Sequence, residues 1–265
     1  MIEQINPVEH NRAAWDRLVD VDNEWTRPVS SQTVARARMG EWAVVLIGHE
    51  PTPRDWLPPV MNGVDVLCLA SGGGQQGPVL AAAGANVTVF DNSPRQLSQD
   101  EQVAAREDLT LRTVLGDMRD LSVFVDASFD LIFHPVANCF CPDLAPLWRE
   151  CFRVLRPAGT LLAGFMNPDV SIFDEQALDD GGELVVRHPL PHTRVAETIE
   201  FSHTMTAQIG CQLAAGFVLT GFTEARHHQD ATARFLPAFF ATRAVKPAWP
   251  EWATPPGSRF RAPPA

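Results

Sequence analysis

The sequence predicts an α/β fold built on a doubly wound, mostly parallel sheet. Three observations predict it. Between residues 64 and 166, short apolar segments alternate with segments of helical spacing, a rhythm typical of a parallel sheet covered on both faces. A glycine-rich loop, SGGGQQG (71–77), follows the first apolar segment, and Asp91 ends the second. Loops at the carboxyl ends of strands are where open α/β sheets bind their ligands.

The first sixty residues precede this rhythm and are expected to form an N-terminal helical segment (1–60). A helix is expected over 6–20, with Asn6 or Asn11 as its cap and Ala14, Trp15 and Leu18 on one face. A second helix is expected over 33–40, and the proline-rich stretch 49–59 reads as a connector.

The main domain is expected to span 61–245. Its strands are expected at 64–70, 86–91, 109–117, 128–136 and 160–166, and its helices at 77–84, 94–106 and 144–155. Ser93 and Asp143 precede two of these helices and suit N-caps.

After Asn167 the alternation breaks, and 167–200 is expected to be a substrate insertion. It holds a short strand at 183–187 followed by a loop. A helix over 204–215 and closing strands at 216–222 and 233–244 complete the domain, and 246–265 forms a proline-rich tail.

Composition excludes several classes of protein. The 45% hydrophobic and 20% charged content is ordinary for a globular chain. The net charge is −11 and Lys246 is the only lysine, which argues against a nucleic-acid partner. No apolar run approaches the roughly 20 residues that span a bilayer, and the start of the chain has no signal pattern. Five cysteines without a paired framework favour a reducing compartment, so a cytoplasmic location is expected.

The glycine loop admits two ligands. Gly72, Gly74 and Gly77 match the GxGxxG pattern of dinucleotide-binding proteins, which would indicate nicotinamide chemistry. The same loop can receive another nucleoside ligand, because glycines allow close approach to the backbone. In either case the Asp91 carboxylate can accept both ribose hydroxyls.

Four motifs in order favour the second ligand. VLCLASGGG (66–74), VTVFDNSPRQL (87–97), GDMRDL (116–121) and the segment 128–162 resemble the motifs of the class I methyltransferase family, over residues 60–245. This resemblance implies a seven-stranded, Rossmann-like methyltransferase fold with an antiparallel closing strand. It also implies an enzyme with S-adenosylmethionine as cofactor. Two positions depart from the family pattern: Cys68 stands for an acidic residue that often helps to hold the methionine ammonium end, and Ala70 stands for the first glycine.

The resemblance also implies residue roles. The loop would line the methionine portion, Asp91 would bind the ribose, and Asp117 and Met118 would contact the adenine. The residues expected to bind cofactor are Ala70, Ser71, Gly72, Gly73, Gly74, Asp91, Asn92, Gln96, Asp117, Met118 and His134.

His134 is the leading candidate for a general base, because imidazole titrates in the useful range. Its alternative role is to shape the loop or contact cofactor. Asn138 is the candidate for orienting the acceptor, or else it caps the loop.

Trp25 and Arg27 are expected to face the site from an N-terminal lid, although the tryptophans of this segment can equally serve only to dock it. His188, His192 and His203 are expected to line the substrate pocket. No metal is expected at Cys139/Cys141, at His188/His192 or at His227/His228/Asp230, because the spacing suits no metal-ligand set.

Three functions compete. The first is methylation of a small-molecule acceptor, by in-line transfer and without a membrane or nucleic-acid partner. The second is a non-catalytic protein that binds S-adenosylmethionine or S-adenosylhomocysteine. The third, less favoured, is a nicotinamide-dependent oxidoreductase, which usually needs an acid such as tyrosine, and this chain has no tyrosine. Monomer and homodimer both remain open.

Overall fold

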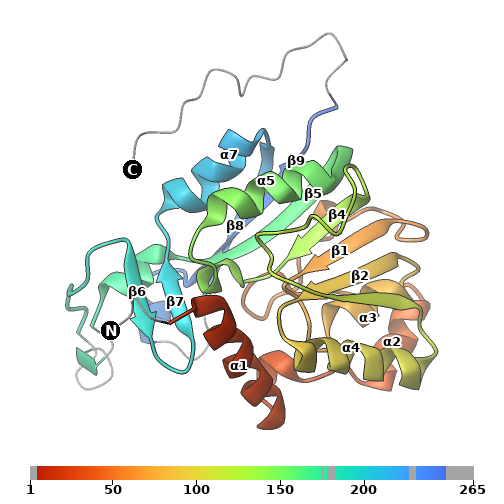
Figure 1. Ribbon diagram of the computed structural model, residues 1–265, viewed down its shortest axis with the longest axis horizontal. Helices are drawn as coiled ribbons and strands as arrows, with labels where there is room; N and C mark the ends of the chain where they lie inside the picture. The colour runs from red at the N-terminus through yellow and green to blue at the C-terminus, as the bar shows by residue number, and fades with distance from the viewer. Residues whose placement is uncertain (1–4, 175, 178–182, 227–230, 249–265) are drawn as a thin grey trace.

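The computed structural model describes residues 5–174, 176–177, 183–226 and 231–248. A seven-stranded sheet in the order β3-β2-β1-β4-β5-β9-β8 forms its centre (Figure 1). The strands are β1 (Asp65–Leu69), β2 (Asn86–Asp91), β3 (Leu111–Leu115), β4 (Phe129–His134), β5 (Leu155–Met166), β8 (Val218–Ala225) and β9 (Phe239–Val245). Only β9 pairs antiparallel with its neighbours, β5 and β8, and the remaining pairs are parallel. The predicted fold class is confirmed.

Helices cover both faces of the sheet. On one face lie α2 (Ser31–Arg38), α3 (Gln76–Ala82) and α4 (Pro94–Glu107), and on the other lie α5 (Leu144–Val154) and α7 (Cys211–Ala215) (Figure 1). Alternate side chains of β1 enter two separate cores, with Cys68 on the α3 side and Leu67 on the α5 side. The strands are apolar on both faces because both are buried.

The predicted helix caps are confirmed. The side chain of Asn6 accepts a hydrogen bond from the amide of Val8 at the start of α1 (Pro7–Asp20). Ser93 accepts from the amide of Gln96 at the start of α4, and Asp143 does the same for Ala145 at the start of α5. These caps satisfy backbone donors that the first turn of a helix leaves free.

Asn11 does not cap α1 but joins it to a hairpin distant in sequence. Its amide nitrogen donates to the carbonyl of Ile199 at 2.9 Å, and its Oδ1 accepts from the amide of Ile199 at 2.7 Å. The hairpin consists of β6 (His192–Val195) and β7 (Ile199–Ser202). The N-terminal helix and the insertion after β5 are therefore fixed to each other above the carboxyl edge of the sheet.

Three elements differ from expectation. Residues 183–187 form no strand, since Val186 makes only a single bridge to Phe173. The β6–β7 hairpin lies partly where a loop was predicted, because the residues of β6, His-Thr-Arg-Val, show no alternation of polar and apolar side chains. β9 begins at Phe239 rather than at 233, because Pro237 cannot donate to a strand ladder and 231–234 form a 3₁₀ turn.

No helix in the described part of the chain is long and apolar enough to cross a membrane. The tail from 249 onward lies outside the described residues.

Candidate active site

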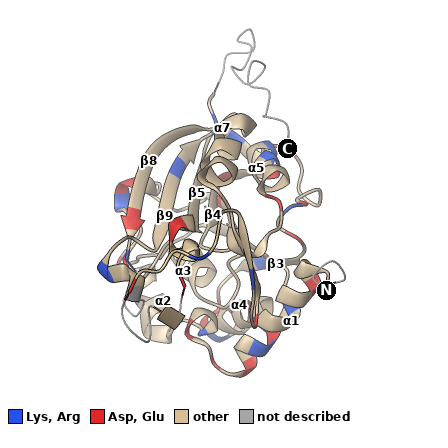
Figure 2. Ribbon diagram, turned by 90° about the vertical axis from the view of Figure 1, so that its left-hand side faces the viewer, with Lys and Arg blue, Asp and Glu red and all other residues tan. Residues whose placement is uncertain are grey.

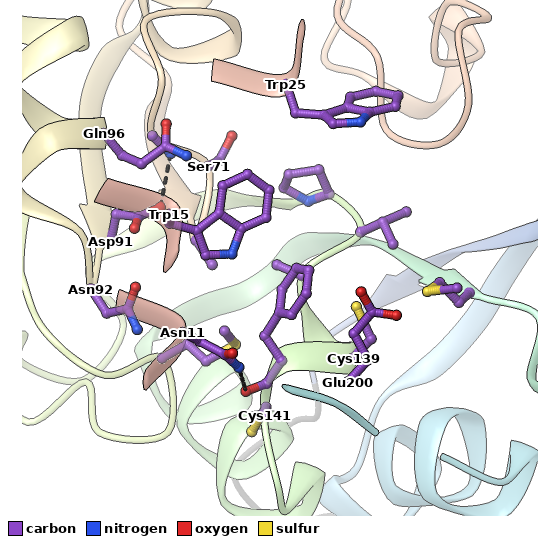
Figure 3. Close-up of a pocket in the computed structure, with 18 of the residues that line it drawn as sticks. Asn11, Trp15, Trp25, Ser71, Asp91, Asn92, Gln96, Cys139, Cys141 and Glu200 are labelled. Atoms are coloured by element: carbon purple, nitrogen blue, oxygen red, sulfur yellow. Dashed lines mark hydrogen bonds between the residues drawn. The ribbon is translucent and has the colours of Figure 1, made fainter. Parts of the chain in front are cut away.

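A cavity of about 640 Å³ opens at the carboxyl edge of the sheet. Its walls come from the loops after β1, β2, β3 and β4, from α1 and the segment after it, and from the β6–β7 hairpin. Figure 3 shows Asp91, Asn92 and Gln96 on one side, Trp15 across the middle, and Cys139 and Glu200 on the opposite side. The cavity is large enough for a drug-sized ligand.

The glycine loop is held directly against the end of β2. The amide of Gly72 donates to Asp91 Oδ2 at 3.0 Å, and the amide of Ser93 donates to Asp91 Oδ1 at 2.9 Å. A Cβ at position 72 would lie 2.7 Å from the Cβ of Gln96, so only glycine fits there. Burial raises the pKa of the Asp91 carboxyl, and the amides of Ser93 and Gly72 oppose that rise.

The three glycines have different surroundings. Gly72 lines the cavity with Ala70 and Ser71, whereas Gly73 and Gly74 are turned away from it. The amide of Gly73 donates to the carbonyl of Gln96, and the carbonyl of Gly74 accepts from the amide of Val29. The last two glycines therefore connect the loop to α4 and to the N-terminal segment.

Asp117 and Met118 line the same cavity after β3, together with Arg119. Both carboxylate oxygens of Asp117 accept from Arg119, the shortest contact being 2.6 Å from the guanidinium to Oδ2. This ion pair raises the pKa of the Arg119 guanidinium. A Cβ at Gly116 would collide with the ring of Phe90, so the turn packs tightly against β2. Asn92 and Gln96 also line the cavity, and Asn92 donates to the carbonyl of Val8 at 3.4 Å.

Aromatic rings close the other end. Trp15 packs edge-on against Phe140 with ring centroids 5.3 Å apart. Trp25 lies over His49 at 5.2 Å, and its side chain stands above the cavity in Figure 3. Glu200 lines this end beside Cys139, and its Oε1 accepts from the hydroxyl of Thr198 at 2.9 Å.

His134 does not reach the cavity, contrary to expectation. Its side chain is fully buried, and its Nδ1 lies 3.0 Å from the carbonyl of Leu69. Burial lowers its pKa to about 4, so the imidazole is neutral near pH 7. The ring packs edge-on against Trp148, inside the core under α5. It joins the carboxyl ends of β4 and β1.

Asn138 is also buried and lies outside the main cavity, in a 3₁₀ turn (Asn138–Phe140) that packs against β7. Its neighbours in that turn, Cys139 and Phe140, do line the cavity. Burial raises the pKa of the Cys139 thiol well above its usual value, as does the nearby Glu200. Cys139 is therefore an apolar wall residue and no nucleophile.

Four further residues expected at the site lie elsewhere. Arg27 is exposed and pairs with Asp22 at 3.1 Å, outside the cavity lining. His188 and His192 stack on each other with ring centroids 4.3 Å apart, away from the cavity. His203 lies against the carbonyl of Cys141 at 2.7 Å and borders only a small separate pocket. His227, His228 and Asp230 lie outside the described residues.

Several cavity residues were missed. They include Val8, Asn11, Trp15, His49, Arg119, Phe140, Arg194, Glu200 and Phe239. Six of these nine come from the N-terminal segment and the hairpin, which carry no motif. Arg119 could have been suspected, because it lies two residues after Asp117.

Comparison with known proteins agrees with this geometry. A family model described as "Methyltransferase domain" matches residues 67–163. An uncharacterized methyltransferase, YbaJ, from Bacillus subtilis is 46% identical over 253 residues, which cover 90% of this chain and 98% of that protein.

Solved structures share the fold. An S-adenosylmethionine-dependent methyltransferase from Mesorhizobium loti gives a TM-score of 0.58 at 18% identity, over 72% of this chain and 94% of that one. The 1,6-didemethyltoxoflavin-N1-methyltransferase of Burkholderia thailandensis, solved with S-adenosylhomocysteine bound, gives a TM-score of 0.56 at 16% identity. The match covers 92% of this chain and 91% of that one.

The sheet order, the glycine loop after β1 and the acid at the end of β2 together define a nucleoside-binding α/β enzyme. The chain belongs to the class I S-adenosylmethionine-dependent methyltransferase family. It is a methyltransferase, and its cofactor is S-adenosylmethionine, so the nicotinamide alternative is set aside.

Proposed function

We propose that this enzyme transfers the methyl group of S-adenosylmethionine, by in-line displacement, to a small molecule held in the same cavity. The observation that carries the proposal is the continuity of that cavity, which runs from Asp91 and the glycine loop to Glu200 on the hairpin. One continuous space of about 640 Å³ offers room for the nucleoside at one end and an acceptor of modest size at the other.

The nucleoside end fits the cofactor. Each Asp91 oxygen accepts one backbone amide, and a carboxylate oxygen has two lone pairs, so capacity remains for the ribose hydroxyls. Asn92 and Met118 would hold the adenine, with Gln96 beside them. Asp117 would receive the adenine amino group in addition to Arg119. Ala70, Ser71 and Gly72 would line the amino-acid end.

The sulfonium of S-adenosylmethionine supplies an activated methyl group, so the protein's main task is alignment. Positioning of two reactants can supply roughly 7–11 kcal/mol of the barrier in favourable cases. Trp15, Phe140 and Phe239 would hold the acceptor through flat apolar contacts. Their rings also exclude water from the reacting end.

The acceptor end supplies the candidate base. His134 is neutral and buried away from the cavity, so we assign it to the joining of β4 and β1 and not to proton transfer. Glu200 lines the acceptor end, where its Oε1 accepts a hydrogen bond from the hydroxyl of Thr198. A proton released by the acceptor would pass to the Glu200 carboxylate.

The segment 24–29 would act as the lid, with Trp25 as its inward face. Gln75 Nε2 donates to the carbonyls of Glu24 and Arg27 at 3.0 and 3.1 Å, which fixes this segment on the glycine loop. Both hydrogen bonds go to backbone carbonyls, so neither of them restrains the side chain of Trp25. The lid would order when the cofactor binds.

The free thiols support a cytoplasmic location, and the charged residues support a soluble small molecule as the acceptor. All five cysteines are free, and four of them are buried. Figure 2 shows acidic and basic residues interleaved along α1, and the net charge of −11 disfavours binding to a phosphate backbone.

The proposal is tested in two steps. Calorimetry should detect S-adenosylhomocysteine binding to the full chain, and incubation with a metabolite extract should convert S-adenosylmethionine to S-adenosylhomocysteine above the rate without extract. Binding without turnover against any extract would favour the non-catalytic binder. Turnover that depends on added protein or RNA instead of small molecules would sink the small-molecule proposal.

A further inference from the structure

A carboxyl group lies buried behind the glycine loop, where the cavity does not reach. Asp100, on the inward face of α4, has no exposed surface. Neither of its carboxyl oxygens has a hydrogen-bond partner that meets normal geometry. Burial, together with the charge of Asp91, raises its pKa to about 8. Such a group destabilises the fold, so its presence calls for a reason other than packing.

Asp100 faces the rear of the loop. Its Oδ1 would lie 3.2 Å from a Cβ at Gly77, so the first turn of α3 approaches it closely only because that residue is glycine. The amides of Gly73 and Gly74 lie near enough to lower its pKa, although neither completes a hydrogen bond. The amide of Gly73 is shared with the carbonyl of Gln96, one turn earlier on α4.

Among the residues that the structure describes, the elements around Asp100 provide no countercharge. β1 brings Cys68, which is fully buried, and both burial and Asp100 raise the pKa of its thiol. β2 brings Asp91, which carries the same sign. α1 brings Asp16, which accepts from the hydroxyl of Ser93, and β3 brings Arg112, which stacks over the ring of Phe124. The amides of the loop are therefore the groups that can receive the Asp100 charge.

We propose that Asp100 is a positioning residue, whose carboxylate holds the glycine loop from behind in the shape that receives the amino-acid end of the methyl donor. When ionised, it accepts from the amides of Gly73 and Gly74 and fixes the two peptide planes that follow Gly72. The carbonyls of Gly72 and Gly73 share these two peptide planes. Because each peptide is planar and trans, both carbonyls point away from Asp100. Gly72, which does line the cavity, is thereby fixed between Asp91 and these planes.

The inference rests on the proposed function, because it assumes that the loop receives the amino-acid end. Two ligands separate the two ideas. S-adenosylhomocysteine has the amino-acid end, whereas 5′-methylthioadenosine has the same nucleoside and sulfur without it. Calorimetry with both, on the wild-type chain and Asp100→Asn between pH 6.5 and 8.5, measures the contribution of the loop alone. Glu101→Gln, at the next and exposed position of α4, is the matched control.

In the wild type, S-adenosylhomocysteine should bind at least about fivefold more tightly at pH 8.5 than at pH 6.5, and 5′-methylthioadenosine should change by less than about twofold. Asp100→Asn should abolish this pH dependence and lose about tenfold in affinity for S-adenosylhomocysteine at pH 8.5. Glu101→Gln should behave as the wild type.

If Asp100→Asn loses affinity equally for both ligands, or loses affinity for neither, the inference is overturned and the proposed function stands. If Asp100→Asn does not fold, the pH dependence of the two affinities in the wild-type chain serves as the test. A ratio of these affinities that stays constant with pH overturns the inference. A wild-type chain that binds neither ligand would overturn the proposed function and the inference together.

Discussion

The carboxylate of Asp91 accepts a hydrogen bond from the amide of Gly72 at 3.0 Å, which joins the end of β2 to the glycine loop after β1. The same carboxylate is proposed to bind the ribose. One side chain thus shapes the loop and is proposed to bind the sugar. Different variants of Asp91 should separate the loss of the loop contact from the loss of the ribose contact.

Asp91→Ala should weaken S-adenosylhomocysteine binding by at least about tenfold, because two hydrogen bonds to a charged acceptor are lost. Asp91→Asn keeps one oxygen acceptor and should lose less. Isothermal calorimetry measures both, with Asp20→Ala, an exposed position on α1, as the control. Unchanged affinity in Asp91→Ala would refute the ribose assignment.

His134→Ala should destabilise the protein by about 2–4 kcal/mol, because it leaves a void against Trp148 and an unpaired Leu69 carbonyl. His134→Asn can place an N–H where Nδ1 lies and should recover part of that loss. Urea denaturation measures the difference. A variant of wild-type stability and cofactor affinity that loses turnover more than a hundredfold would instead make His134 a base.

The same histidine should make stability fall on acidification. Its pKa is about 4 in the folded chain against an ordinary value of 6.5, so between these values the unfolded chain binds the additional proton. The free energy of unfolding should therefore fall as the pH drops from 6.5 to 4. In His134→Asn this part of the pH dependence should be missing from denaturation curves recorded across that range.

Asp100 should act in the opposite direction. Its carboxyl keeps its proton up to about pH 8 in the folded chain but loses it near 3.8 when unfolded. The folded state binds more protons in this window, so stability should fall as the pH rises from 4 to 8. Asp100→Asn should be more stable than the wild type at pH 8, by about 2–5 kcal/mol, in thermal and urea unfolding. An equal or lower melting temperature would show that hydrogen bonds from the amides of Gly73 and Gly74 fully offset the cost of the buried charge.

Gln75→Ala should release the segment 24–29, because both carbonyls that Gln75 holds belong to it. We expect S-adenosylhomocysteine to dissociate several-fold faster and chymotrypsin to cleave sooner after Trp25. Gln102→Ala, whose side chain bonds only Ser98 among the described residues, is the control. Dissociation at the wild-type rate would mean that this segment docks without closing the site.

Glu200→Gln should lower turnover at least about tenfold and leave S-adenosylhomocysteine affinity unchanged, since Glu200 lies at the acceptor end. Turnover is measured with the metabolite fraction that supports wild-type activity. Thr198→Val, which removes the hydroxyl that Glu200 accepts from, should give a smaller loss. A parallel fall in cofactor affinity would move Glu200 out of the acceptor subsite.

The sheet and the nucleoside end could be predicted because their signals are local. A buried strand is rich in apolar residues, and Asn, Ser and Asp are favoured as helix caps. Gly72 has no side chain because it packs closely against Gln96. These constraints appear as motifs along one stretch of chain.

The acceptor end could not be predicted, because tertiary contacts alone create it. Glu200 reaches the cavity through a hairpin whose position depends on Asn11, 188 residues away in the sequence. His134 looked like a site residue because it ends a central strand. Whether such a side chain turns toward the ligand or into the core is decided by packing, here against Trp148.

The clamp between Asn11 and Ile199 has a consequence for how such an enzyme can change its acceptor. The hairpin that we propose to contact the acceptor is hydrogen-bonded to the helix beside the proposed cofactor site, so we expect that neither can be exchanged with a relative's version alone. A chimera that transplants the hairpin should work only when the donor's first helix travels with it, and new substrate ranges would then arise by paired replacement of both segments.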